Sequence, residues 1–138
     1  MGVGVDQAGQ DDVVRNLEPL GPDVAGVMIT NPNTCGLFER DMKAISDAVH
    51  GVGGYVYCDG ANFNAIVGRV RPGDLGIDAM HINLHKTFST PHGGGGPGSG
   101  PVVLSEALSP YGPIPYSAKM PDGSYKLVEE ESVDAMHP

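Results

Sequence analysis

The chain has 138 residues, 40% of them hydrophobic and 6% aromatic, which suits one ordinary domain or a piece of a larger one. Its formal net charge of −9 argues against binding to nucleic acids or to anionic membranes, which both need clustered basic residues. No secretory signal, no membrane-spanning stretch and no CxxC pair is present, so we expect a soluble, intracellular protein in a reducing compartment.

The first two predicted elements are a strand and a helix. Residues 24–30 form a short β-branched run before Asn31-Pro32-Asn33, which predicts a buried strand followed by a turn. Residues 38–50 place apolar side chains three and four positions apart with charged residues between them, which predicts an amphipathic helix. This helix is expected to end near Gly51.

Three further strands are expected at residues 55–58, 78–84 and 102–104. Apolar runs that alternate with a helix favour an α/β fold with a mostly parallel sheet. The segment after Tyr111 has many Pro and acidic residues and no clear period, so its structure stays open.

Several polar residues come just past the ends of the predicted strands. They are Asn31, Asp59, His85 and Lys86. In open α/β sheets this edge is where ligands bind.

Lys86 and Asp59 are the first candidates for chemistry. A lysine that loses its proton in a closed site becomes a nucleophile for carbonyl groups, although Lys86 also fits an ordinary lysine at a strand end. An ionised Asp59 could hold the nitrogen of a pyridine cofactor protonated, although an Asp before Gly is also a common turn residue.

Histidines and glycines leave two further interpretations open. His81, His85 and His92 could bind a metal, but the predicted strand at residues 78–84 puts His81 and His85 in series along the chain without a third converging ligand, so we expect no metal site. The loop Gly93–Gly98 could approach a ligand closely or serve as a flexible linker. It matches neither a Walker A nor a Rossmann motif.

Three blocks of sequence, taken together, resemble the glycine decarboxylase P-protein of the glycine cleavage system. The blocks are Thr30-Asn-Pro-Asn-Thr-Cys-Gly-Leu-Phe-Glu39, Asp59-Gly-Ala-Asn-Phe-Asn-Ala65 and His81-Ile-Asn-Leu-His-Lys-Thr-Phe-Ser-Thr-Pro-His-Gly-Gly-Gly-Gly-Pro-Gly98. Their order and spacing match as well, and the resemblance is best over residues 24–105.

The resemblance implies a fold-type I enzyme that depends on pyridoxal 5′-phosphate (PLP). Residues 1–110 would be part of its PLP-binding large domain, and residues 111–138 a tail of uncertain structure. By position, Lys86 is the lysine that forms the Schiff base, Asp59 the partner of the pyridine nitrogen, and Ala61 a contact of one ring face. The carboxylate of Asp59 and the amine of Lys86 are then expected to face the same pocket.

The resemblance implies five further cofactor-binding residues. Asn83 and His85 match an Asn-x-His-Lys pattern in which both side chains lie near the phosphate. Thr30, Asn31 and Asn62 are expected to line the pocket.

The implied activity is that of glycine dehydrogenase (aminomethyl-transferring, decarboxylating). Glycine loses its carboxylate, and the aminomethyl group passes to the lipoyl arm of H-protein, in bacterial cytoplasm or the mitochondrial matrix. The chain is far shorter than a P-protein. We therefore expect a fragment that needs the missing part of the P-protein or a partner P subunit, within an oligomer in the full enzyme. An inactive fragment, or another fold-type I decarboxylase or aminotransferase, stays open.

Overall fold

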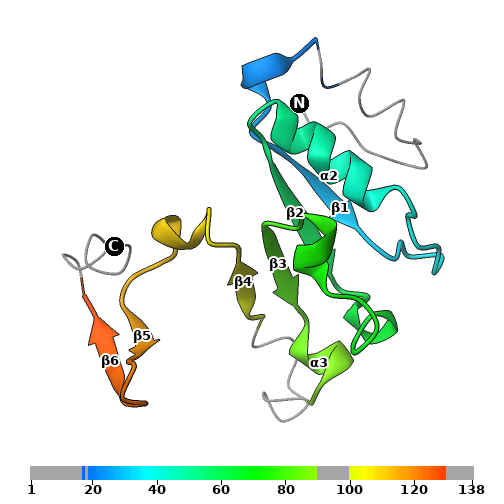
Figure 1. Ribbon diagram of the computed structural model, residues 1–138. Helices are drawn as coiled ribbons and strands as arrows, with labels where there is room; N and C mark the ends of the chain where they lie inside the picture. Colours follow the sequence, from blue (N-terminus) through cyan, green and yellow to red (C-terminus); the bar gives the residue numbers. More distant parts are fainter. Residues whose placement is uncertain (1–16, 18, 90–99, 130–138) are drawn as a thin grey trace. The chain divides into compact units, whose positions relative to one another are not determined.

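The computed structural model describes Leu17, residues 19–89 and residues 100–129, and the chain divides into two compact units after Ser105. The first unit contains a four-stranded sheet and the longest described helix, α2 (Figure 1). The second unit contains a two-stranded sheet. No described helix is long and apolar enough to cross a membrane.

The four-stranded sheet has the order β1-β2-β3-β4. Its strands are β1 (Gly26–Thr30), β2 (Tyr55–Gly60), β3 (Ala79–Ile82) and β4 (Val102–Leu104). The first three strands are parallel, and β4 joins the edge of β3 antiparallel. The prediction of an α/β fold with a mostly parallel sheet is confirmed.

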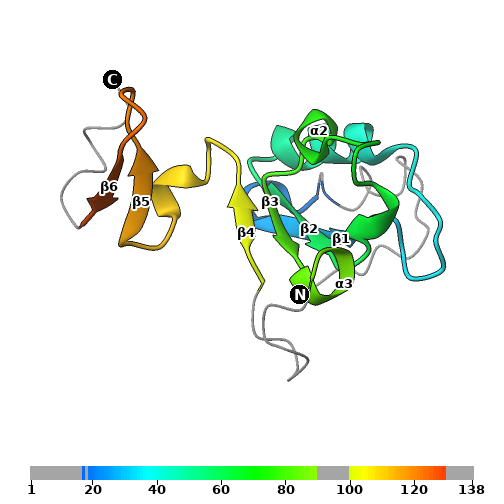
Figure 2. The ribbon, with the colours of Figure 1, turned by 90° about the horizontal axis from the view of Figure 1, so that it is seen from below.

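The helix α2 (Met42–Gly51) covers one face of this sheet (Figure 2). Its buried apolar residues Met42, Ile45 and Val49 recur at helical spacing and pack against Val56 of β2. Farther along the sheet, a second buried cluster contains Cys58, Ile66 and Met80. Because alternate residues of a strand point to the same face, Val56 and Cys58 both lie on the α2 side.

The predicted start of this helix at residue 38 is wrong, because residues 31–41 form a loop held by side chains. The side-chain oxygen of Asn33 accepts hydrogen bonds from the backbone N–H groups of Cys35 and Leu37, both at 3.0 Å. The side-chain oxygen of Asn31 accepts one from Glu39 at 2.9 Å. Such side-chain bonds satisfy backbone N–H groups outside a helix. The helix therefore begins only at Met42.

The predicted strand at residues 78–84 is also too long. The chain leaves β3 at Ile82 and enters a single helical turn, α3 (Leu84–Thr87). The carbonyl oxygen of Asn83 accepts hydrogen bonds from the backbone N–H groups of Lys86 (3.1 Å) and Thr87 (3.2 Å). His85 and Lys86 therefore lie on a helical turn and not on an extended segment.

The other helices whose full range lies within the described residues are short and of the 3-10 type: Gly21–Asp23, Phe63–Ala65, Pro72–Leu75 and Ser109–Tyr111. The second unit contains a hairpin that the sequence analysis did not predict, formed by β5 (Tyr116–Lys119) and β6 (Tyr125–Val128). In its turn, the hydroxyl and backbone N–H of Ser124 both donate to Asp122 and lower the pKa of that carboxyl.

Asp78 connects several elements of the first unit. Its Oδ2 accepts a hydrogen bond from the buried backbone N–H of Val56 at 2.8 Å and lies 2.7 Å from Nε2 of His50 in α2. Its Oδ1 accepts a bond from the hydroxyl of Ser105, just past β4, at 3.3 Å. One nearly buried carboxylate thus links β2, α2 and the end of β4.

We expect Asp78→Ala to lower the free energy of unfolding by about 2 kcal/mol, because the N–H of Val56 is left buried without its acceptor. Urea denaturation measures this change. Asp74→Ala is the matched control, since Asp74 is exposed and, among the described residues, its side chain pairs with exposed Arg71 alone. It should shift the free energy of unfolding by no more than about 0.5 kcal/mol. Equal stability of the two variants would contradict the linking role of Asp78.

Candidate functional site

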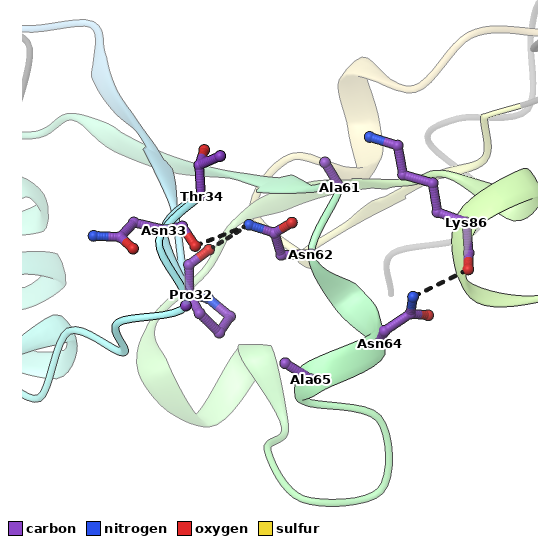
Figure 3. A pocket seen from close by; sticks show the side chains of 9 residues that line it. Pro32, Asn33, Thr34, Ala61, Asn62, Asn64, Ala65 and Lys86 are labelled. Carbon is purple, nitrogen blue, oxygen red and sulfur yellow. Dashed lines mark hydrogen bonds between the residues drawn. The ribbon is translucent and has the colours of Figure 1, made fainter.

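The segments that follow β1, β2 and β3 surround a pocket at the carboxyl edge of the parallel strands (Figure 3). The first two segments give it amide and small side chains, and α3 gives it Lys86. Its lining residues are Pro32, Asn33, Thr34, Gly36, Ala61, Asn62, Asn64, Ala65 and Lys86. This is the edge at which ligands bind in open α/β sheets.

Asn62 fixes two of these segments to each other. Its side-chain N–H₂ donates to the backbone oxygens of Pro32 at 2.9 Å and Asn33 at 3.1 Å (Figure 3). The loop after β1 is thereby held against the loop after β2. Asn62 therefore helps to form the pocket and also lines it.

Lys86 enters the pocket from α3. The side-chain N–H₂ of Asn64 donates to the backbone oxygen of Lys86 at 3.1 Å, which fixes the backbone from which the side chain extends. In Figure 3 this side chain extends away from Asn64, toward the part of the pocket where Ala61 lies. Lys86 is exposed, and Ala61 and Ala65 leave room beside it. A primary amine in an open pocket lined by small residues can react with a carbonyl group of a flat ligand.

Asp59 does not itself line this pocket, but it lies two residues before Ala61, which does. Its Oδ1 accepts a hydrogen bond from the backbone N–H of Ala61 at 2.8 Å and lies 3.1 Å from Nε2 of His81. Within the described residues no group donates to Oδ2. The side chain is about a quarter exposed (26%), so Oδ2 can still receive a proton donor from a ligand.

The register of the sheet aligns Thr30, Asp59 and His81 in one row across β1, β2 and β3. These residues lie on the face opposite α2, because their strand positions alternate with those of the buried cluster. In the sequence, His81 is considered only as a possible metal ligand and is not predicted as a partner of Asp59.

Two groups beside Asp59 have pKa values raised mainly by burial. Burial raises the pKa of the Tyr57 phenol, with smaller contributions from Asp59 and Cys58. Burial also raises the pKa of the Cys58 thiol, against an opposing hydrogen bond from the backbone of Asn31. Both groups therefore keep their protons at neutral pH.

Two buried polar atoms near the pocket have no hydrogen-bond partner among the described residues. They are Nδ2 of Asn31, directly after β1, and Oγ1 of Thr87, directly after Lys86. Buried polar groups are rarely left unpaired, so such atoms mark places where a ligand can supply the partner. Thr87 was not singled out in the sequence analysis.

The structure thus brings three of the predicted residues, Ala61, Asn62 and Lys86, to one pocket. Asn83 and His85 lie next to Lys86 along the chain, on the connection from β3 and on α3. Whether Asp59 and Lys86 contact one cofactor stays a prediction.

The described part of the chain contains no group of three or more His, Cys, Asp or Glu residues that could hold a metal. His92 and the loop Gly93–Gly98 lie outside the described residues. The expectation of no metal site therefore also stays a prediction.

Comparison with known proteins gives close sequence relatives. The chain is 64% identical over 126 residues to the probable glycine dehydrogenase (decarboxylating) subunit 2 of Caulobacter vibrioides, covering 91% of the chain and 24% of that protein. It is 54% identical over 123 residues to the protein of the same description from Nitrosococcus oceani, covering 89% of the chain and 25% of that protein.

The chain is homologous to a segment of glycine dehydrogenase subunit 2. It spans about a quarter of the length of these relatives. No family model matches it.

A crystal structure of glycine decarboxylase (P-protein) in inhibitor-bound form matches with a TM-score of 0.57 over 95% of this chain and 27% of that one. At 20% sequence identity this structural similarity shows the fold alone. It is the α/β fold that the sequence analysis expects.

Proposed function

We propose that this chain provides the PLP-attachment segment of a glycine dehydrogenase (decarboxylating), with Lys86 as the attachment residue. The observation that carries the proposal is the 64% identity to glycine dehydrogenase subunit 2 in a chain that places a lysine in a pocket at the carboxyl edge of its sheet. The activity belongs to the whole protein, and this chain spans about a quarter of its relatives.

The residues around the pocket fit PLP. The cofactor needs an amine for its aldehyde, a carboxylate for its ring nitrogen, space for a flat ring and donors for its phosphate. Lys86 offers the amine. Asp59 offers a carboxylate, and no described residue donates to its Oδ2. Ala61, which lines the pocket, has a small side chain that leaves space for a ring. The buried polar atoms of Asn31 and Thr87, to which no described residue bonds, supply further hydrogen-bonding capacity beside the pocket.

Each residue then has a distinct task. Lys86 would hold the cofactor through its amine, and as a free amine it could accept or return a proton. Asp59 would accept the N–H of the ring nitrogen and so favour the protonated form of that nitrogen. Ala61 allows close contact with one ring face, and Asn62 keeps the two loops that frame the pocket together. When bound, the cofactor takes up the electron pair released as the carboxylate of glycine leaves.

The proposed reaction needs further components. The aminomethyl group would pass to the lipoyl arm of H-protein, and the description "subunit 2" of the relatives implies a second subunit. The remaining three quarters of the relatives' length would supply the other side of the site. The proposed assembly is therefore a P-protein in which this chain contributes the attachment lysine and the carboxylate.

The test is release of carbon dioxide from carboxyl-labelled glycine. The chain is mixed with PLP, lipoylated H-protein, subunit 1 of a relative and the remainder of that relative's subunit 2 as separate polypeptides. We expect carbon dioxide release to require this chain. The Lys86→Ala variant should abolish release, whereas Lys43→Ala should retain it, because the side chain of Lys43 is exposed on α2. Release that is unchanged without the chain, or equal from labelled leucine, would contradict the proposed function.

A further inference from the structure

On the sheet face opposite α2, Tyr57, His81 and Asp59 form a continuous chain of polar contacts. The hydroxyl of Tyr57 lies 2.8 Å from Nδ1 of His81, and Nε2 of the same ring lies 3.1 Å from Oδ1 of Asp59. The rings of Tyr57 and His81 are also stacked, with centroids 5.8 Å apart and planes inclined by 28°. Both nitrogens of His81 are therefore engaged.

The parallel register of β2 and β3 produces this arrangement. It pairs Asp59 with His81 and Tyr57 with Ala79, so that His81 lies beside Asp59 and diagonally across from Tyr57. All three side chains share one face of the sheet. The contact therefore belongs to the paired strands and does not depend on a loop.

The chemistry of the partners sets the protons on His81. A carboxylate only accepts hydrogen bonds, so the contact with Oδ1 of Asp59 favours a proton on Nε2 of His81. Tyr57 keeps its phenolic proton, because burial raises its pKa, and so its hydroxyl can donate to Nδ1. With its proton on Nε2, the ring of His81 connects the phenol to the carboxylate.

The backbone N–H of Ala61 donates to Oδ1 of Asp59, and Nε2 of His81 lies 3.1 Å from the same oxygen. A hydrogen bond and a close polar contact at one oxygen restrict the rotation of the carboxylate. Oδ2 is the oxygen to which no described residue donates.

The geometry points to His81 as a positioning residue for the proposed PLP site: it lies between Tyr57 and Asp59 and holds the Asp59 carboxylate turned so that Oδ2 could accept the N–H of a pyridine ring. This inference rests on the proposed function and adds two residues to it. His81 does not touch the cofactor; it acts through Asp59.

The test compares two ligands that differ at the ring nitrogen. They are PLP and its analogue in which a carbon replaces that nitrogen. Their dissociation constants are measured by equilibrium dialysis against the chain and its variants, each combined with subunit 1 and the remainder of subunit 2 used in the release assay. We expect His81→Phe, which keeps a stacking ring without a donor, to weaken PLP roughly tenfold. The same variant should change the dissociation constant of the analogue by no more than about twofold, because the analogue has no ring N–H to donate to Asp59.

Two further variants separate positioning from folding. His81→Gln keeps an amide donor for Asp59 and should recover most of the affinity for PLP. Tyr57→Phe keeps the stacked ring and should weaken PLP less than His81→Phe does. NMR of the ring nitrogens in the chain without PLP should show the proton of His81 on Nε2.

The outcomes separate the two claims. If His81→Phe weakens both ligands equally, or His81→Gln restores nothing, the positioning role is overturned while the PLP site stands. If the combined polypeptides bind neither ligand in a manner that depends on Lys86, the proposed function fails and this inference fails with it.

Discussion

Replacing Lys86 with arginine is expected to reduce the PLP that borohydride fixes onto the chain to the background level. The substitution keeps a positive charge and a long side chain, but the guanidinium group of arginine stays protonated and does not condense with an aldehyde. The backbone contact from Asn64 is made to the carbonyl oxygen of residue 86 and survives the change. A loss of fixed PLP would therefore be due to the missing amine and not to a change in the shape of the pocket.

The matched control is Lys43→Arg. Lys43 lies on α2, is about half exposed and pairs with Asp47, so it has no part in the pocket. This variant should retain the full yield of fixed PLP, measured by absorbance of the reduced chain after gel filtration. A yield of fixed PLP that falls equally in both variants would mean that PLP reacts with surface lysines in general. That result would contradict Lys86 as the specific attachment residue.

Gly60→Ala is expected to lower the free energy of unfolding by about 3 kcal/mol or more. Gly60 is the last residue of β2, and a Cβ atom there would lie 1.7 Å from the backbone oxygen of His81 and 2.9 Å from Cε of Met80. The methionine end can move, but the strand backbone can move only if β2 and β3 separate. That movement would also pull Asp59 away from His81.

Gly73→Ala controls for the loss of a glycine. Gly73 also lies in the first unit, in the short helix Pro72–Leu75, and a Cβ atom there would meet no atom within 4 Å. This variant should stay within about 0.5 kcal/mol of the parent in urea denaturation. If Gly60→Ala unfolds at the same urea concentration as Gly73→Ala, the close approach of β2 and β3 at this point is not real.

The parts of the fold that were predictable depend on local pattern. Met42, Ile45 and Val49 recur at helical spacing, and they are the residues that α2 buries. The short β-branched and aromatic runs likewise mark β1, β2 and β4. A segment whose side chains face one core carries that period in its own sequence, so no knowledge of distant residues is needed.

The boundaries that were missed depend on competing local bonds. Asn31 and Asn33 hold the loop before α2 through their side-chain oxygens, and the helical period of the following residues does not show this. The hairpin in the second unit had a visible signal in its turn, Pro121-Asp122-Gly123-Ser124, where Gly123 has a φ of 84°. This turn sequence predicts a hairpin more strongly than does the weak alternation of apolar and polar residues in the flanking strands.

The site was predictable only in part for a different reason. The motifs identified Lys86, Ala61 and Asn62, which line the pocket. The contact between Asp59 and His81 needs the register of two strands separated by 18 intervening residues of loop and short helix, Ala61–Asp78. Register is a property of the assembled sheet, so the sequence could name both residues without pairing them.

The most direct measurement is to find where PLP attaches on the unsubstituted chain. The chain, combined with subunit 1 and the remainder of subunit 2 used in the release assay, is incubated with PLP, reduced with borohydride and digested, and the modified peptides of this chain are identified by mass spectrometry. The account predicts that the pyridoxyl group lies on Lys86, with little on exposed Lys43, Lys119 or Lys126. Modification spread evenly over these lysines, or absent from Lys86, would contradict the claim that this chain carries a PLP-attachment site.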